Sequence, residues 1–364
     1  MLSPKQIMTW IETNVKDMRK SRLKTLAAVV EGAMAMGGLG VLALGRAMNT
    51  RTTAKHNIKR VNGFLGNESV ETIAVARALF DVFAPRQGRV LVLADWTDVS
   101  NGKMLIFALP CSGRALPLLS VCVPKQAGEG ALKAAEEKGL HQLAEVVGDC
   151  GDVALVTVAD RGFGNRRWIK AVRQRGWHYV QRLAGLFFVE VEEYIGTLSD
   201  MGLRRGARPR DWGTGIFGEK GEVAGRLITV FDKQAKEPWY LVTDLDDVSA
   251  AQAVGIYRKR MWIEALFRDC KNRDWGLRLD AVKLKDYRRY ERLFVVFALA
   301  FIFLTAFGAA AERAGFDRGF KANTAKHRVI NLIRMGFRYL GLQRCTLEDA
   351  VTVLRTMPAT VGAA

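Results

Sequence analysis

The sequence has little cysteine and little histidine, and both shortages limit the chemistry it can hold. The five cysteines are odd in number and scattered, without a Cys-x-x-Cys pair: Cys111, Cys122, Cys150, Cys270 and Cys345. Neither a disulfide framework nor a zinc ribbon is indicated. With four histidines in 364 residues, a histidine-built metal centre is not expected either. The first 20 residues are amphipathic and lack the apolar run of a secretion signal, so we expect a reduced, bacterial-type cytosol.

Acidic residues are also scarce relative to basic ones. The chain has 37 Asp and Glu against 55 Lys and Arg, which gives a formal net charge of +18. Such a surplus predicts attraction to polyanions, nucleic acid first and an anionic membrane surface second. The apolar share of 49% and charged share of 25% are typical of globular proteins and argue against a disordered or fibrous chain. The length indicates two or three domains.

One segment is apolar enough to raise the question of a membrane. Residues 293–311 carry no charge, and three arginines precede them within six positions. A membrane span with a cytoplasmic basic flank is one interpretation, and a helix buried on all sides in a large domain is the other. Phe, Val and Ala dominate rather than Leu, so we favour the buried helix and expect no membrane partner.

The first 85 residues show helical patterns, with a turn at residues 37–40 (Gly-Gly-Leu-Gly) between two apolar stretches. Residues 16–60 contain ten Lys and Arg against two acidic residues. A compact helical unit with one basic face is typical of a DNA-binding domain, which we assign to residues 1–85. Ordinary solvated charges are the alternative.

The pattern changes after residue 85. Short apolar runs at 89–96 and 103–109 flank an Asn-Gly pair, a strong hairpin signal. A helix at 130–147, a strand at 153–159 and a helix at 165–175 then indicate an α/β sheet. We expect a catalytic domain at 86–310, with a β-rich insertion at 177–245. One long amphipathic helix follows, from 249 to about 273, and a helical C-terminal segment covers 311–364.

Two aspartates close predicted strands. Asp95 follows the first apolar run and Asp160 follows the strand at 153–159. In open α/β sheets the carboxyl ends of the strands are where functional sites are built. For each aspartate alone, a cap or turn residue is the more frequent case, and Asp98 competes with Asp95.

A third carboxylate belongs to a helical strip. Tyr257, Arg260, Glu264 and Lys271 are spaced by 3, 4 and 7 residues. At about 100° per residue they fall within roughly 60° of one another on one helix face. The strip could hold a metal with the glutamate and phosphates with the other three side chains. The alternative is an exposed face with an Arg260–Glu264 pair, although apolar neighbours indicate a helix packed on several sides.

This string, Tyr-x2-Arg-x3-Glu-x6-Lys, resembles the signature of one branch of bacterial insertion-sequence transposases. That branch belongs to the Asp-Asp-Glu (DDE) superfamily, and the transposase of the kanamycin-resistance transposon is a close architectural relative. The other landmarks follow in the expected order: Asp95 in LADWTD, Asp160 in VADRGF and a β insertion before Glu264. The resemblance implies an α/β fold with a ribonuclease-H-like core, and it covers most of the chain.

The resemblance also implies a chemistry. Asp95, Asp160 and Glu264 would hold two Mg²⁺ or Mn²⁺ ions for in-line phosphoryl displacement, first by water and then by the released 3′-OH on target DNA. Asp95 is preferred to Asp98 because Asp-x-Thr matches the family. The remaining residues would contact DNA: Tyr257, Arg260 and Lys271 at phosphates near the cleaved end, Trp239 at a flipped base, and Arg161, Arg166 and Arg167 on a basic flank. A tryptophan buried in a strand is an equal alternative for Trp239.

The sequence therefore predicts a cut-and-paste transposase that binds terminal inverted repeats and target DNA in the bacterial cytoplasm, at the nucleoid. A homodimer in the synaptic complex is implied by the resemblance alone. Two rival functions stay open: a structure-selective nuclease on the same core, and a non-enzymatic DNA-binding repressor.

Overall fold

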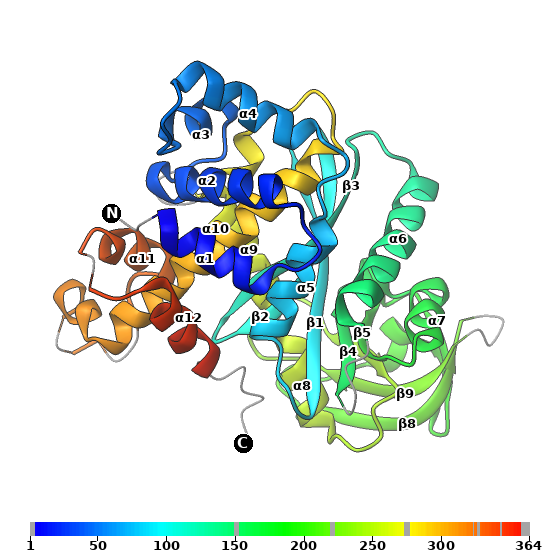
Figure 1. Cartoon of the computed structure of the whole chain (residues 1–364). Coiled ribbons are helices and arrows are strands. Elements are labelled where there is room, and N and C mark those ends of the chain that lie inside the picture. Colours follow the sequence, from blue (N-terminus) through cyan, green and yellow to red (C-terminus); the bar gives the residue numbers. More distant parts are fainter. Residues whose placement is uncertain are drawn as a thin grey trace.

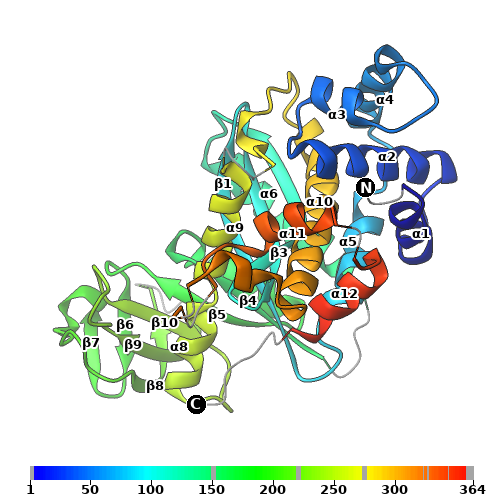
Figure 2. The ribbon, with the colours of Figure 1, turned by 90° about the vertical axis from the view of Figure 1, so that its left-hand side faces the viewer.

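The computed structural model describes residues 4–148, 153–218, 223–272, 277–322, 324–325, 328–342 and 344–357, so Cys150 lies outside the described residues. Five helices come first: α1 (Pro4–Asn14), α2 (Lys20–Met36), α3 (Val41–Ala47), α4 (Ala54–Gly66) and α5 (Thr72–Phe83). The predicted break between α2 and α3 is confirmed, and Gly37 ends α2 with a left-handed φ of 61° that suits glycine. These helices and the strands β8 and β9 lie at opposite ends of the molecule (Figures 1 and 2).

Within the described residues, ten strands form a single mixed sheet. They are β1 (Arg89–Val99), β2 (Gly102–Cys111), β3 (Arg114–Pro124), β4 (Ala154–Ala159), β5 (His178–Leu183), β6 (Phe188–Val191), β7 (Tyr194–Thr197), β8 (Arg210–Phe217), β9 (Val223–Val230) and β10 (Trp239–Thr243). Their order is β3-β2-β1-β4-β5-β10-β9-β8-β6-β7. The β1–β2 hairpin at Asn101-Gly102 is confirmed, and β1 runs parallel to β4. β4 ends at Ala159, opposite Ala94, whereas β1 continues to Val99. Asp95 therefore lies inside β1, beside the end of β4, and does not close its strand as predicted.

Two features of the sheet differ from the prediction. Strand β3 was not predicted, since Pro117 and Pro124 weaken the strand pattern; the β2–β3 ladder accommodates Pro117 with a register shift at Phe107/Ala108. Strand β5, which the prediction placed in the insertion, runs parallel to β4 instead. A short apolar run looks the same whether its partner is parallel or antiparallel, so the pattern could not place it. The later strands continue the same sheet.

Helices cover the sheet on both faces. The helices α6 (Glu129–Val147) and α7 (Arg166–Gln174) agree with the prediction. The single long helix predicted from residue 249 is wrong: it is two helices, α8 (Ala250–Arg258) and α9 (Met261–Lys271). At the junction, the amides of Arg260 and Ile263 bond to carbonyls three residues back, which tightens the turn and starts a new axis. Four short 3₁₀ turns complete this part: η1 (Arg161–Phe163), η2 (Leu198–Met201), η3 (Leu279–Ala281) and η4 (Phe316–Phe320).

The apolar segment forms the centre of the molecule. Within the described residues, α10 (Arg289–Arg313) is the single helix long and apolar enough to cross a membrane, and its most apolar stretch is completely buried. The pair α2 and α3 meets the same test only as one span, yet the two helices meet at 98°. Helix α10 runs through the core beneath α2 (Figures 1 and 2) and packs against α11 (Leu332–Leu340) and α12 (Leu347–Thr356).

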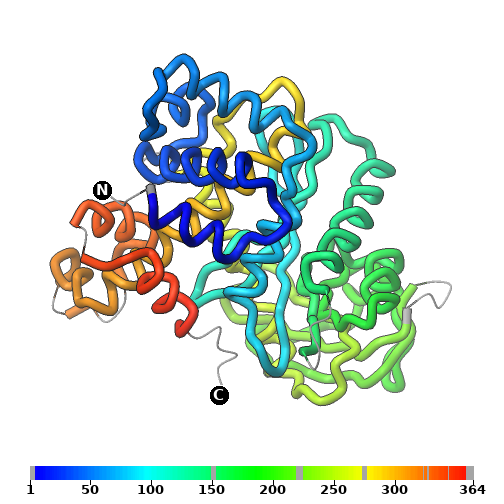
Figure 3. The backbone as a smooth tube through the Cα atoms, in the orientation of Figure 1, coloured from blue at the N-terminus to red at the C-terminus, as the bar shows by residue number. Residues whose placement is uncertain are grey.

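The two ends of the described chain meet. The backbone amide of Leu347, at the start of α12, donates to the side-chain Oε1 of Gln6 in α1 at 3.0 Å. The trace in Figure 3 shows α12 returning beside the N-terminal helices. Close packing of α11 on α10 depends on glycine: a Cβ on Gly308 would lie 1.9 Å from the carbonyl oxygen of Leu332, and one on Gly336 would lie 1.9 Å from that of Leu304.

Candidate active site

Three carboxylates from three elements surround one guanidinium. The Nη2 atom of Arg260 lies 2.7 Å from Asp95 Oδ2 and 3.2 Å from Asp160 Oδ2. Its Nη1 atom donates to Glu264, one turn further along α9. Asp95 belongs to β1 and Asp160 directly follows β4, so the parallel pairing of these strands brings the two aspartates together. The three predicted carboxylates therefore meet, although they meet around an arginine.

Arg260 is held firmly in this position. The residue is 8% exposed, and its Nε atom is buried without a hydrogen-bond partner in the described part of the chain. Burial alone would lower the pKa of the guanidinium, but Asp95, Asp160 and Glu264 outweigh it and the pKa rises. Arg260 is consequently charged at every physiological pH and balances much of the negative charge around it.

The two aspartates have different environments. Burial raises the pKa of Asp95, against the opposing effect of Arg260 and the Trp96 amide. Burial acts the same way on Asp160, but Arg260, the amide of Arg161, the Tyr257 hydroxyl and Arg182 together hold its pKa below the ordinary value. The Tyr257 hydroxyl donates to Asp160 Oδ1 at 3.0 Å, and Tyr257 is 1% exposed. Asp160 is thus the carboxylate with the most hydrogen-bond donors directed at it.

A tight turn after β4 fixes Asp160. A Cβ on Gly164 would lie 2.4 Å from the carbonyl oxygen of Arg182, so this turn can approach β5 only because residue 164 is glycine. The buried amide of Gln181 donates to the carbonyl oxygen of Asp160 at 2.6 Å. Asn165 then caps α7 by accepting from the amide of Trp168 at 3.0 Å. Gly164 of the sequence ADRGFGN therefore helps to position the carboxylate of Asp160.

The other predicted residues divide into two groups. Trp239, at the start of β10, is half buried and packs edge-on against Tyr257 with ring centroids 5.0 Å apart, so it borders the carboxylates. Lys271 is exposed at the end of α9, and among the described residues it forms no ion pair with the three carboxylates. Asp98 is exposed, three residues past Asp95 on β1, and does not join the cluster.

Arg182 also lies at the site, although the sequence pattern did not single it out. Arg182 on β5 lies 3.7 Å from Asp160 Oδ1 and 2.7 Å from Glu237 Oε1, with its side chain 12% exposed. The sequence shows it only as the last of seven basic residues between 161 and 182. Its role depends on β5 lying beside β4, a pairing that the sequence did not predict.

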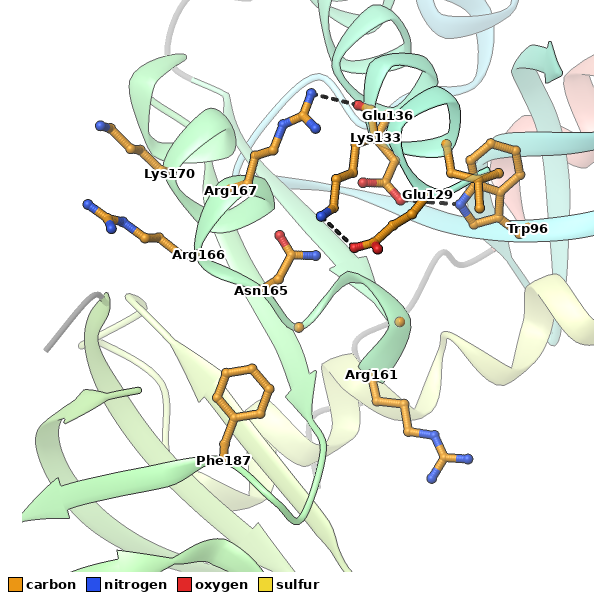
Figure 4. A pocket seen from close by; sticks show the side chains of 13 residues that line it. Trp96, Glu129, Lys133, Glu136, Arg161, Asn165, Arg166, Arg167, Lys170 and Phe187 are labelled. Atoms are coloured by element: carbon orange, nitrogen blue, oxygen red, sulfur yellow. Dashed lines mark hydrogen bonds and ion pairs between the residues drawn. The ribbon is translucent and has the colours of Figure 1, made fainter. Parts of the chain in front are cut away.

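A basic hollow adjoins the carboxylates. Figure 4 shows it between α6 and α7, with Arg161, Arg166 and Arg167 among its lining residues. Its volume is about 860 Å³. Arg161 pairs with Glu237 at 3.3 Å, and Arg167 donates to the carbonyl oxygen of Lys133 at 2.8 Å. The structure thus brings the predicted basic flank to the side of the cluster.

The donor set suits hard divalent cations. Asp95, Asp160 and Glu264 offer only carboxylate oxygens, the ligands that Mg²⁺ and Mn²⁺ prefer. Among the described residues, no three His, Cys, Asp or Glu side chains lie close enough to hold one ion as they stand. Their shared contact with Arg260 nevertheless shows that the three side chains reach a common point that favours positive charge.

Comparison with known families decides the broader identity. The family model described as "Transposase DDE domain" matches residues 120–303, just over half of the chain. The chain belongs to the DDE transposase family. No curated protein matches it. The matched part of this DDE transposase runs from β3 into α10 and includes Asp160 and Glu264, whereas Asp95 precedes it.

Membership fixes the coarse function. A DDE transposase is a DNA-binding, nucleic-acid-cleaving enzyme, and the family generally uses divalent metal ions. The surplus of basic residues and the carboxylate cluster are consistent with this class of enzyme.

Proposed function

We propose that this DDE transposase binds the terminal inverted repeats of its own element and moves it by cutting and pasting. The observation that carries the proposal is the convergence of Asp95, Asp160 and Glu264 on Arg260. These carboxylates come from positions 95, 160 and 264, so only the fold joins them. The Tyr257-Arg260-Glu264-Lys271 string supports membership of the branch with that signature and a similarity to the kanamycin-resistance transposon's transposase.

On the strand that is transferred, the reaction has two balanced steps. In the first, a water oxygen attacks a phosphorus at the element end, the bond from phosphorus to the 3′-oxygen breaks, and a free 3′-OH remains on the element. In the second, that 3′-oxygen loses its proton and attacks a phosphorus of target DNA, and the target's own 3′-oxygen leaves. The first step hydrolyses one phosphodiester bond, and the second replaces one phosphodiester bond with another. Neither step therefore needs an external energy source.

Asp95, Asp160 and Glu264 would hold two Mg²⁺ or Mn²⁺ ions. Bound there, the ions would stabilise the attacking and leaving oxygens of an in-line displacement. Tyr257 keeps Asp160 oriented through its hydroxyl hydrogen bond. Arg260 neutralises the carboxylates. It would bind a DNA phosphate in their place when the metal ions are present, since a guanidinium binds phosphate and carboxylate with the same geometry. Trp239, next to Tyr257, offers an aromatic face to a base near the cleaved end.

The wider organisation follows the same proposal. The strand order β3-β2-β1-β4-β5, with β1 parallel to β4, supports a ribonuclease-H-like core within residues 86–310. We assign the helices of residues 1–85 to recognition of the inverted repeats because of their basic surplus. Lys271, Arg161, Arg166 and Arg167 would contact DNA phosphates. Residues 311–364 would support a homodimer in the synaptic complex, and we place the protein in the cytoplasm, at the nucleoid.

The test is to incubate the full chain with Mg²⁺ and DNA that contains its own gene with both flanks, then to map the product termini. The proposal predicts cuts at the two element ends and joined products in added plasmid. Cuts without joining would instead indicate a structure-selective nuclease. Binding without Mg²⁺-dependent cuts would indicate a repressor.

A further inference from the structure

The hollow between α6 and α7 is a distinct surface of the molecule. Lys133 and Glu136 line it from α6, Arg166 and Lys170 from α7, and the aromatic side chains of Trp96 and Phe187 also border it. At about 860 Å³ it lies within the range of sites that bind ligands, about 300–1,000 Å³. Figure 4 shows Trp96 and Phe187 at separate ends, so apolar walls accompany the charges. Such a mixture suits a nucleotide chain better than a bare anion.

The charge of the hollow is positive. Among the residues that the structure describes, five Lys and Arg side chains line it against two glutamates. Both glutamates are already engaged: Glu129 pairs with Lys133 at 2.5 Å, and Glu136 accepts from the Trp96 indole at 3.4 Å. Arg166 and Lys170 are one helical turn apart on α7, and Figure 4 shows them extending side by side. Two cations spaced in this way can contact successive phosphates of one strand.

The hollow is lined by Trp96, the residue after Asp95, and it lies on the opposite face of the sheet from the carboxylates. Trp96 follows Asp95 on β1, so their side chains lie on opposite faces. Trp96 faces α6, whereas Asp95 faces Arg260 at the start of α9. Arg161, which also lines the hollow, directly follows Asp160 in the sequence. A polynucleotide in the hollow would thus reach the carboxylates from the direction opposite to Tyr257 and Trp239.

Joining requires two DNA molecules at one centre. Within the proposed function, the element end lies along Tyr257, Arg260 and Trp239, which leaves the opposite approach for the second DNA. We propose that the α6–α7 hollow binds the phosphate backbone of target DNA, with Lys170 and Arg166 as its principal contacts. The inference rests on the proposed function and adds to it the location of the second substrate. Phosphate contacts carry no base information, so this site would accept many sequences.

Lys170→Glu tests the inference, with Lys285→Glu as a matched charge reversal at another exposed lysine. The first measurement is cleavage of DNA that carries the element ends. The second is binding of a short labelled duplex of unrelated sequence, without divalent ions, to protein premixed with excess unlabelled duplex from the flank of the gene. We expect Lys170→Glu to weaken the second DNA's binding about tenfold and to reduce its salt slope by about one. Cleavage should stay within about twofold, and Lys285→Glu should change neither quantity.

Two results would overturn the inference. Unchanged binding of the unrelated duplex by Lys170→Glu would show that the hollow holds no target DNA. A parallel loss of end cleavage would show that it holds the element end instead. If the wild-type protein forms no cleavage product, the proposed function is wrong. The binding measurement needs no cleavage, so it still decides whether the hollow binds a second DNA.

Discussion

Removing the Arg260 guanidinium should destabilise the protein more than any exposed ion pair would. The change leaves Asp95 and Asp160, which are largely buried, without their principal counter-charge. Breaking a buried ion pair by removing one partner costs about 3–5 kcal/mol. Glu264, whose side chain is 42% exposed, adds only a few tenths because water screens it. We therefore expect Arg260→Ala to lose about 3 kcal/mol at neutral pH, a fall in Tm of roughly 6–12 °C for a domain of this size.

The matched control is Arg258→Ala, two residues earlier. Arg258 pairs with Asp232 at 2.9 Å, but both side chains are exposed, so its loss should cost less than about 1 kcal/mol. Differential scanning fluorimetry with and without Mn²⁺ compares the two variants. Mn²⁺ should raise the Tm of Arg260→Ala more than that of Arg258→Ala, because the carboxylates then lack any other cation. Adding Asp95→Asn to Arg260→Ala should restore part of the loss, since one buried charge is removed.

Equal Tm losses for Arg260→Ala and Arg258→Ala would refute the reasoning. So would an equal rise with Mn²⁺ in both variants, because the ion would then bind elsewhere. The effect of acid supplies a further check. The folded pKa of Asp160 lies below its unfolded value, so its contribution is present above the unfolded pKa and is lost as the pH falls through the folded pKa. Arg260→Ala should weaken this acid dependence.

Three further outcomes follow from named contacts. Gly308→Ala or Gly336→Ala should cost about 3 kcal/mol in urea unfolding, since the added Cβ meets backbone atoms, whereas Gly255→Ala, with open space in α8, should be neutral or stabilising; equal effects would contradict the packing. Burial raises the pKa of Glu31 to about 7 against a hydrogen bond from Asn49, so the folded state keeps a proton that the unfolded chain loses from pH 4.5 upward. Stability should fall as the pH rises from about 4.5 to 7, and Glu31→Gln should remove this fall and gain about 1 kcal/mol at pH 8. Asp98→Ala should keep wild-type cleavage rates, and a loss equal to that of Asp95→Ala would reopen the choice between them.

Much of the site could be predicted because its residues follow local signals. Asp95 and Asp160 follow apolar runs that favour strands, and the parallel pairing of these strands places Ala94 opposite Ala159, directly before the two aspartates. Glu264 was located by its spacing from Tyr257 and Arg260, even though the helix breaks between them. The break itself depends on a tightened turn at residues 259–260, and the helical pattern runs through it without interruption.

The rest depends on contacts far apart in the sequence. Strand β3 contains two prolines and is recognisable only beside β2. Arg182 reaches Asp160 because β5 pairs with β4, a choice between partners that an apolar run does not encode. The central position of Arg260 could not be predicted either, since the spacing of residues 257–271 indicated that Arg260 binds a phosphate and not three carboxylates. These positions are fixed by tertiary packing.

The central claim is that Asp95, Asp160 and Glu264 form one catalytic centre. Single-turnover cleavage of element-end DNA in Mg²⁺ tests it most directly, with DNA binding measured in parallel by gel shift. Asp95→Asn, Asp160→Asn and Glu264→Gln should each lower the cleavage rate by about 10³-fold or more while the protein still binds the DNA. Any of the three variants cutting at the wild-type rate would contradict the account.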